Sequence, residues 1–393
     1  MKRLVYLKAR IARQKKVLAA WMTENEMTRE ARRKPFIQHL RRAATYLGPK
    51  NSRNFAMKYT KLGSTGVQVS RICLGTWQLG GQWGAAAREG GIRAVARALE
   101  LGINIFDTAA AYGEGESEAG LAKGLGSALK SRREEIVICT KGGVEIRHSD
   151  GRQAIFRNCD EDFLRSGLER SLRLLGTDYV DVFTIHWPDE TIPFEETAAV
   201  VQKFVDEGLV RHIGISNFDA RQTEEFARHC KVAFNQLPYS LLDRRIAADI
   251  IPVCEQRGMG ILAWGPLAHG VLGGELPSDS SKFAQDDWRA QHPEFQGDKL
   301  RTLAGVVAQL TQRAQQKGCS LPQLAIAWML NSPHKVMPIV GAMEPAHVDA
   351  ALGALEIQLS DADIRELEQI VEPVHPFALS TLRGEDLIQH RSR

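Results

Sequence analysis

Short apolar runs alternate with longer amphipathic stretches over most of this chain, from Met57 to about residue 372. The amphipathic stretches carry apolar residues at helical spacing, of which Ile92, Val95 and Leu99 are one example. The apolar runs are rich in β-branched residues and end in polar residues or glycine, which is typical of buried parallel strands. Eight such strands are predicted, at Arg71–Gly75, Ile103–Asp107, Ile136–Lys141, Val180–His186, His212–Ser216, Val232–Asn235, Ile261–Trp264 and Val336–Val340.

Two more short strands, Tyr59–Leu62 and Val67–Ser70, are joined by the turn Gly63–Gly66 and predict a β-hairpin ahead of the first run. Eight β/α units in about 280 residues match the usual size of a closed eight-stranded barrel. A doubly wound open sheet normally shows a GxGxxG turn after its first strand, and this sequence has none. We therefore predict an α/β fold, a (β/α)8 TIM barrel with an N-terminal β-hairpin, over residues 57–372.

The first 56 residues lack this alternation. They hold 15 Lys and Arg against three acids, a net charge of +12, which leaves −8 for the rest of a chain whose total is +4. We predict that residues 1–56 are a basic, weakly ordered N-terminal extension, or that the true start is Met57. A basic arm that binds nucleic acid or anionic lipid is the alternative. The acidic main body predicts no nucleic-acid partner, and residues 373–393 are predicted to be a C-terminal tail.

Cysteine usage and hydropathy narrow the setting of the protein. The six cysteines are scattered without a CxxC pair or Cys/His ligand spacing, so we predict neither a metal site nor a disulfide framework. A reducing cytoplasm fits this usage best. No apolar run approaches the roughly 18 to 20 residues that a membrane span needs, so no membrane partner is expected. The sequence leaves the oligomeric state open.

Polar residues interrupt three successive predicted strands at their C-terminal ends, where a barrel of this kind builds its active site. They are Asp107, followed by Tyr112, then Lys141 and His186. A tyrosine is a poor acid unless a cation stabilises its phenolate, and Lys141 could supply that cation. Asp107 would keep Lys141 charged, and His186 would polarise a carbonyl oxygen. Each residue alone is more typical of a solvated rim, but together they predict a catalytic tetrad.

These motifs, in this order, resemble the aldo-keto reductase family from about Met57 to about Glu372. The segments that carry the resemblance are Leu74–Thr76, Gly102–Gly113, Thr140–Gly142, Tyr179–Asp189, Gly208–Phe218 and Phe234–Tyr239. Within the family, a bacterial general-stress or inositol-operon-like branch is a candidate. The resemblance implies hydride transfer between NADPH and a small-molecule carbonyl substrate, with the tetrad as catalytic residues and Tyr112 as proton donor. A redox-sensing regulatory protein of the same fold, with little turnover, is the alternative.

The resemblance also implies cofactor contacts. Ser216, Asn217 and Gln236 match positions that hydrogen-bond the nicotinamide carboxamide, and Trp264 matches the position that stacks on the ring, with simple packing as its alternative. The remaining implied cofactor-binding residues are Gly75, Thr76, Trp77, Gly265, Pro266, Leu267, Gly341, Met343 and His347.

One position departs from the family pattern. Where a basic residue usually pairs with the 2′-phosphate of NADPH, this chain has Met343, followed by Glu344. A charge-assisted phosphate contact is stronger than a neutral one, so NADPH should bind less tightly than in typical members. NADP(H) is the favoured cofactor, and NAD(H) is the alternative. Substrate specificity is expected from the long loops Gly143–Cys159 and Leu267–Lys299 and from the tail.

Overall fold

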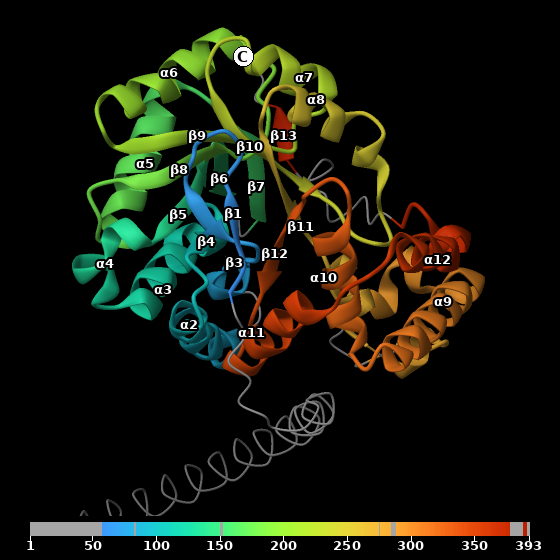
Figure 1. Ribbon diagram of the computed structural model, residues 1–393. Helices are drawn as coiled ribbons and strands as arrows, with labels where there is room; N and C mark the ends of the chain where they lie inside the picture. The colour runs from blue at the N-terminus through green and yellow to red at the C-terminus, as the bar shows by residue number, and fades with distance from the viewer. Residues whose placement is uncertain are drawn as a thin grey trace, which may run out of the picture. The chain divides into compact units, whose positions relative to one another are not determined.

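The computed structural model describes residues 57–81, 84–149, 152–274, 276–283, 288–377 and 388–390, so the prediction for residues 1–56 lies outside the described residues. Eight parallel strands close into a barrel in the order β10-β11-β12-β3-β4-β5-β8-β9 (Figure 1). The strands are β3 (Cys73–Gly75), β4 (Ile105–Asp107), β5 (Val137–Gly142), β8 (Val180–Ile185), β9 (Val210–Ser216), β10 (Val232–Pro238), β11 (Gly260–Trp264) and β12 (Met337–Gly341). The predicted (β/α)8 barrel is confirmed, and every predicted barrel strand overlaps an observed one.

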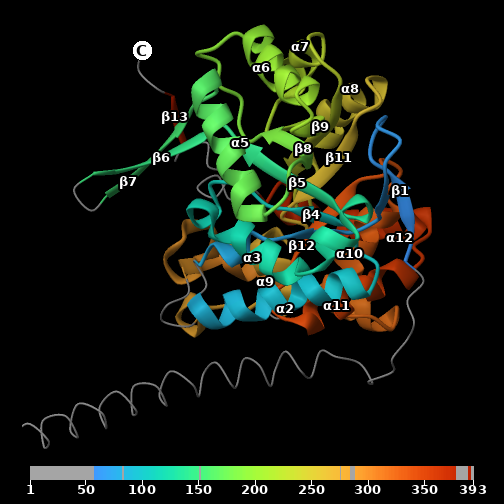
Figure 2. The same cartoon turned by 90° about the vertical axis from the view of Figure 1, so that its left-hand side faces the viewer.

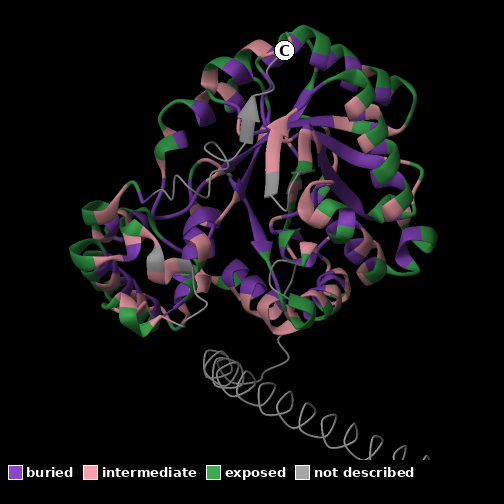
Figure 3. Ribbon diagram, turned by 180° about the vertical axis from the view of Figure 1, so that it is seen from behind, coloured by how far each residue is buried: buried purple, intermediate pink, exposed green. Residues whose placement is uncertain are grey.

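Helices pack around the outside of this barrel, and their exposed faces form its outer surface (Figure 3). The helices are α2 (Gly84–Glu100), α3 (Glu116–Leu125), α4 (Ala128–Ser131), α5 (Glu161–Leu175), α6 (Phe194–Asp206), α7 (Ala220–Phe226), α8 (Ile250–Gln256), α9 (Gly297–Gln316), α10 (Leu321–Asn331), α11 (Pro345–Leu352) and α12 (Asp361–Val371). In α5, the buried residues Leu164, Leu168, Leu172 and Leu175 recur every three or four positions, which turns one apolar stripe toward the strands. Among the described residues, no helix has the length and apolar character needed to cross a membrane.

The interior of the barrel is a packed apolar core. Its buried members include Cys73, Ile105, Val182 and other inward-facing residues of the strands. Leu62 and Val69 belong to the same cluster, and they come from the hairpin formed by β1 (Tyr59–Lys61) and β2 (Gln68–Ser70). The predicted N-terminal hairpin is therefore confirmed, and it covers the end of the barrel at which the strands begin. The opposite rim, where the strands end, carries the predicted catalytic residues.

A second hairpin corrects one expectation. The segment Gly143–Cys159, expected as a long loop, contains the antiparallel strands β6 (Val144–Ser149) and β7 (Arg152–Arg157). In the C-terminal tail, β13 (Ile388–His390) pairs in parallel with β7 and completes a three-stranded sheet. Figure 2 shows this sheet projecting from the barrel beside α5. Backbone hydrogen bonds between these strands order a segment that was expected to be a loop.

Candidate active site

Three neighbouring barrel strands bring the four predicted catalytic residues to one rim. Asp107 ends β4, Lys141 is the next-to-last residue of β5, and His186 directly follows β8. These strands are adjacent and parallel, so their C-terminal ends lie side by side. Tyr112 follows β4 as the first residue of a 3-10 turn, η2 (Tyr112–Gly115).

The turn that carries Tyr112 requires glycine. Gly113, Glu114 and Gly115 have φ values of 58°, 51° and 96°, all in the left-handed region that side chains disfavour. The turn also packs closely on a second one, η1 (Trp77–Gly80), because a Cβ added at Gly113 would lie 2.2 Å from the carbonyl oxygen of Gly80. Backbone contact between the two turns therefore fixes where Tyr112 stands.

Lys141 lies at the centre of the site. Its Nζ donates to Asp107 Oδ2 at 2.7 Å, to the carbonyl oxygen of Thr108 at 2.7 Å and to Tyr112 Oη at 3.3 Å. The three ammonium hydrogens thus have three acceptors. Burial lowers the pKa of Lys141, but the charge of Asp107 and hydrogen bonds with Asp107 and Tyr112 raise it by more. The lysine is therefore charged although it is buried.

Two opposing effects act on the pKa of Tyr112. Burial raises the pKa of its phenol, and the nearby charge of Lys141 lowers it by a smaller amount, so the pKa lies above its ordinary value. The acidifying effect expected of Lys141 is thus present but outweighed by burial. Consequently Tyr112 carries its proton at neutral pH, and Lys141 lowers the cost of giving that proton up.

His186 faces Tyr112 edge to face, with ring centroids 5.7 Å apart and planes at 77°. Burial, and then the positive charge of Lys141, hold the pKa of His186 well below its ordinary value, so the imidazole is neutral. Its Nδ1 atom is buried, and no described residue forms a hydrogen bond with it.

The residues implied to hold the nicotinamide gather at the ends of β9, β10 and β11. Ser216 Oγ donates to the carbonyl oxygen of Gln236 at 2.9 Å, and Trp264 Nε1 donates to Asn217 Oδ1 at 3.2 Å. Asn217 Nδ2 donates to Ser216 Oγ at 3.1 Å and to the carbonyl oxygen of His186 at 3.0 Å. These polar groups therefore form one network that touches the tetrad at His186.

The side chain of Gln236 makes a contact that sequence reasoning missed. Its Nε2 donates to Asp107 Oδ1 at 2.7 Å. The resemblance assigned Gln236 to the cofactor alone, and nothing in the sequence pairs it with Asp107. The glutamine is instead joined directly to the predicted catalytic residues.

After β11 the chain turns sharply through Gly265, Pro266 and Leu267. Gly265 has a φ of 68°, and Ala268 and His269 in the following turn, η5 (Ala268–Gly273), have φ values of 46° and 55°. Residues other than glycine pay an energetic cost in this region, and such strain is concentrated at ligand-binding sites. The strained loop thus starts directly beyond Trp264, at the same rim as the tetrad.

The end of β3 and the turn after it carry three of the implied cofactor-binding residues, Gly75, Thr76 and Trp77. Gly75 and Thr76 are buried, and Thr76 Oγ1 donates to the carbonyl oxygen of Asp107 at 2.9 Å. Ser117, a buried residue of α3 that was not predicted, donates to the carbonyl oxygen of Thr76 at 2.7 Å. Trp77 is 41% exposed, so of these residues it is the one most open to a bound molecule.

At the end of β12, Gly341 and Met343 are exposed, and the backbone nitrogen of Met343 donates to His347 Nδ1 at 3.2 Å. Burial lowers the pKa of His347, which leaves this histidine neutral at pH 7. The methionine side chain thus lies open where the resemblance expects a cation.

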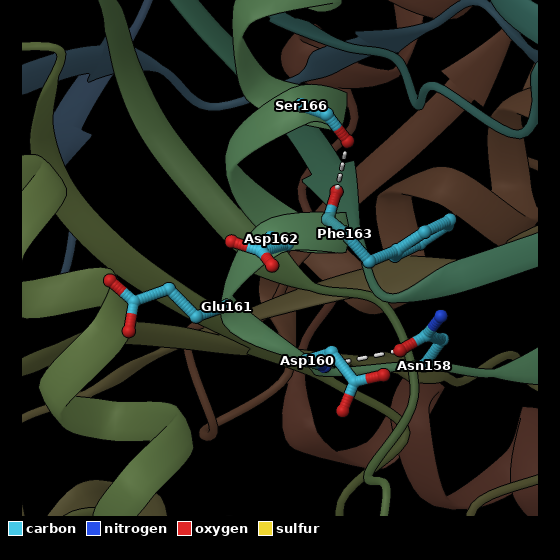
Figure 4. A pocket seen from close by; sticks show the side chains of 6 residues that line it. All are labelled: Asn158, Asp160, Glu161, Asp162, Phe163 and Ser166. Carbon is cyan, nitrogen blue, oxygen red and sulfur yellow. Dashed lines mark hydrogen bonds between the residues drawn. The ribbon is translucent and has the colours of Figure 1, made fainter.

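A separate open pocket lies at the N-terminal end of α5 (Figure 4). It is lined by Asn158, Asp160, Glu161, Asp162, Phe163 and Ser166. None of the tetrad residues lines it. Within the described ranges, no group of three or more His, Cys, Asp or Glu side chains is arranged to hold a metal ion.

Comparisons with known proteins show which family the chain belongs to. A model of the Aldo/keto reductase family matches residues 71–372. The chain is 32% identical over 340 residues to aldo-keto reductase YhdN of Bacillus subtilis, covering 84% of this chain and 100% of that relative. It is also 32% identical over 328 residues to the NADH-specific methylglyoxal reductase of Escherichia coli, covering 80% of this chain and 99% of the relative.

Among solved structures, the glycerol dehydrogenase AKR11B4 from Gluconobacter oxydans superimposes with a TM-score of 0.72 at 29% identity, covering 83% of this chain and 98% of that chain. The sequence match and the shared fold thus indicate the same family. The chain belongs to the aldo/keto reductase family and is an NAD(P)H-dependent oxidoreductase that reduces carbonyl groups of small molecules.

Proposed function

We propose that Tyr112 donates the proton in this reduction and that Asp107, Lys141 and His186 support it. The observation that carries the proposal is the position of Lys141 Nζ, in hydrogen-bond contact with both Asp107 and Tyr112. As the phenol proton leaves, the adjacent ammonium stabilises the negative charge left on Tyr112. Asp107 holds the ammonium in place and keeps it charged.

His186 is suited to orient the carbonyl oxygen. A neutral imidazole carries one proton, and Nδ1 has no acceptor among the described residues. The tautomer with its proton on Nε2 is therefore favoured, which leaves Nε2 to donate a hydrogen bond to the substrate.

The chemistry of the β9–β11 network fits a nicotinamide carboxamide, which both donates and accepts hydrogen bonds. Ser216 contributes a hydroxyl, Asn217 and Gln236 contribute amides, and Trp264 contributes an aromatic face. A reduced nicotinamide supplies the hydride. We propose that these residues hold it at the rim and that the strained loop from Gly265 follows the rest of the cofactor.

The choice between the two nicotinamide cofactors is a finer proposal. Family resemblance favours NADP(H), and the exposed Met343 in place of a cation keeps NAD(H) as the alternative. The relative named an NADH-specific methylglyoxal reductase supports that alternative. Its name, and that of the glycerol dehydrogenase, also make small oxygenated aldehydes and ketones the first substrates to try.

We further assign residues 57–372 to the catalytic barrel and residues 373–393 to a tail whose described strand extends the β6–β7 hairpin. The cytoplasmic location stays a prediction based on cysteine usage; all six cysteines are free thiols.

The test is a comparison of kcat/KM for NADPH and NADH with 4-nitrobenzaldehyde, methylglyoxal and a panel of ketones. We expect turnover with both cofactors and a preference for NADPH below that of an enzyme with a cation at position 343. The matched variant Met343→Arg should shift the ratio toward NADPH by about tenfold, because a charge-assisted phosphate contact is roughly twice as strong as a neutral one. An unchanged ratio would show that residue 343 does not determine the choice of cofactor. Cofactor binding without any turnover would favour the regulatory alternative.

A further inference from the structure

Gln236 is joined to both halves of the site. Its side-chain Nε2 donates to Asp107 at 2.7 Å, and its backbone carbonyl accepts from Ser216 Oγ at 2.9 Å and from the backbone nitrogen of Asn217 at 3.0 Å. Its side chain thus contacts Asp107 of the predicted catalytic tetrad, and its backbone contacts Ser216 and Asn217, which are expected to hold the nicotinamide.

The contact with Asp107 crosses the barrel. In the closed strand order, β10, which carries Gln236, lies four strands from β4, which carries Asp107, in either direction. The two residues therefore sit on opposite walls, and both are at most 3% exposed. A hydrogen bond between them lies over the packed interior, at the floor of the site.

The partner of the amide fixes its orientation. Asp107 Oδ2 accepts from the ammonium of Lys141, and Oδ1 accepts from Gln236. An ionised carboxylate can only accept hydrogen bonds, so the amide must turn its nitrogen toward Asp107 and its oxygen away. Within the described part of the chain, no group donates to Gln236 Oε1. The free oxygen is an acceptor aimed away from the carboxylate.

We propose that Gln236 is a positioning residue that couples cofactor binding to the Asp107–Lys141–Tyr112 group. Its Oε1 is oriented by Asp107 to accept a hydrogen bond from the amide nitrogen of the cofactor carboxamide. This inference rests on the proposed function, and it adds that Asp107 acts on the cofactor through Gln236. If Asp107 acts on the cofactor only through Gln236, loss of the Asp107 carboxylate should weaken cofactor binding while Gln236 is present. The same loss should have little effect once Gln236 has been replaced.

A double-mutant cycle on the full chain tests this. The dissociation constants of NADPH and NADH are measured by tryptophan fluorescence for the wild type, Asp107→Asn, Gln236→Leu and the double variant. We expect Asp107→Asn to weaken binding by about fivefold in the wild-type background, the size of one modest hydrogen bond, and by less than about twofold when residue 236 is leucine. Equal effects in the two backgrounds would show independent action and overturn the proposal.

Two controls keep the result interpretable. Gln222→Leu removes another buried glutamine, which caps α7 and donates to Glu190, and it should leave the dissociation constants unchanged. If Gln236→Leu lowers the melting temperature strongly, Gln236→Met repeats the cycle with an unbranched side chain.

The proposed role of Tyr112 fails separately, because it is judged by turnover and not by binding. Full activity of Tyr112→Phe would show that Tyr112 is not the proton donor, and it would not affect the measured coupling between Asp107 and Gln236. Additive dissociation constants would remove the coupling and leave Tyr112 untouched.

Discussion

Lys141 places a full positive charge inside the protein, with a carboxylate, a carbonyl oxygen and a phenol as its three acceptors. Such a charge is costly unless every partner is present, and removing one partner of a buried pair typically costs about 3 to 5 kcal/mol. Only Asp107 among the three acceptors is charged, so the positive charge of the ammonium is not fully compensated at Tyr112. The residue thereby makes a buried phenol less reluctant to ionise.

This balance predicts a pH effect. If Tyr112 is the proton donor in reduction, it acts as a phenolate in alcohol oxidation, the reverse reaction, so the oxidation rate should rise as the pH approaches the raised pKa of Tyr112. Lys141→Met removes the charge that lowers this pKa, so the rise should move to higher pH, and kcat should fall by about 100-fold or more. The measurement is kcat for oxidation against pH. A variant with the wild-type profile would show that Lys141 does not act on Tyr112.

Lys141→Met leaves the buried carboxylate of Asp107 without its partner, which could damage the fold. Asp107→Asn breaks the same pair from the other side and is the control for that damage. The melting temperatures of both variants separate a loss of folded protein from a change in the profile.

At the residue scale, the sequence identified the side chains that stand at strand ends and missed those that depend on three-dimensional closure. Asp107, Lys141 and His186 each interrupt an apolar run, which is a local signal. The hydrogen bond from Gln236 to Asp107 joins opposite walls of the barrel, and the carbonyl oxygen of Thr108 has no sequence signature. Ser117 had a weak signal, as a small polar residue at the start of an amphipathic helix.

At the scale of elements, helix packing near the β12 end depends on a single missing side chain. Gly90 lies inside α2, against the end of β12, and a Cβ there would come within 2.0 Å of the carbonyl oxygen of Met343. Backbone atoms cannot yield as a flexible side chain can. The glycine therefore sets how closely α2 approaches the segment that precedes α11.

Gly90→Ala should lower the free energy of unfolding by about 2 kcal/mol, because overpacking outweighs the gain in helix propensity. The matched control is Gly167→Ala in α5, where a Cβ would meet nothing within 4 Å. That change should raise stability by roughly 0.5 to 1 kcal/mol. Urea titrations of both variants give the comparison, and a stabilising Gly90→Ala would contradict the packing described here.

The order of the elements was largely predictable, because helical and strand periodicities alternate plainly along the chain. The hairpin β6–β7 was not predicted, although Val144 and Ile146 alternate with polar residues and Asp150-Gly151 is a dipeptide typical of hairpin turns. The strand β13 could not have been predicted, since its three residues pair with β7, which lies more than 200 positions earlier in the chain. Long-range pairing leaves little mark in local sequence.

At the scale of the whole molecule, the two ends of the barrel have different tasks. At the ends where β5, β8 and β9 begin, Arg133 forms a partly buried ion pair with Asp181 at 2.8 Å. Tyr179 lies against Arg133 and Arg211, each 4.0 Å from its ring centroid. This end of the barrel, together with the N-terminal hairpin, is held by an ion pair, ring contacts and apolar packing. The opposite rim carries the polar residues, which matches the division of stability and chemistry in such barrels.

The central step of the proposed reaction is the transfer of a proton from Tyr112. The most direct test is the single-turnover rate of 4-nitrobenzaldehyde reduction by Tyr112→Phe. We predict a fall of at least about 100-fold relative to the wild type, with the dissociation constant of the cofactor unchanged, because only the acid is lost. A Tyr112→Phe protein that reduces the aldehyde at the wild-type rate would show that Tyr112 is not the proton donor.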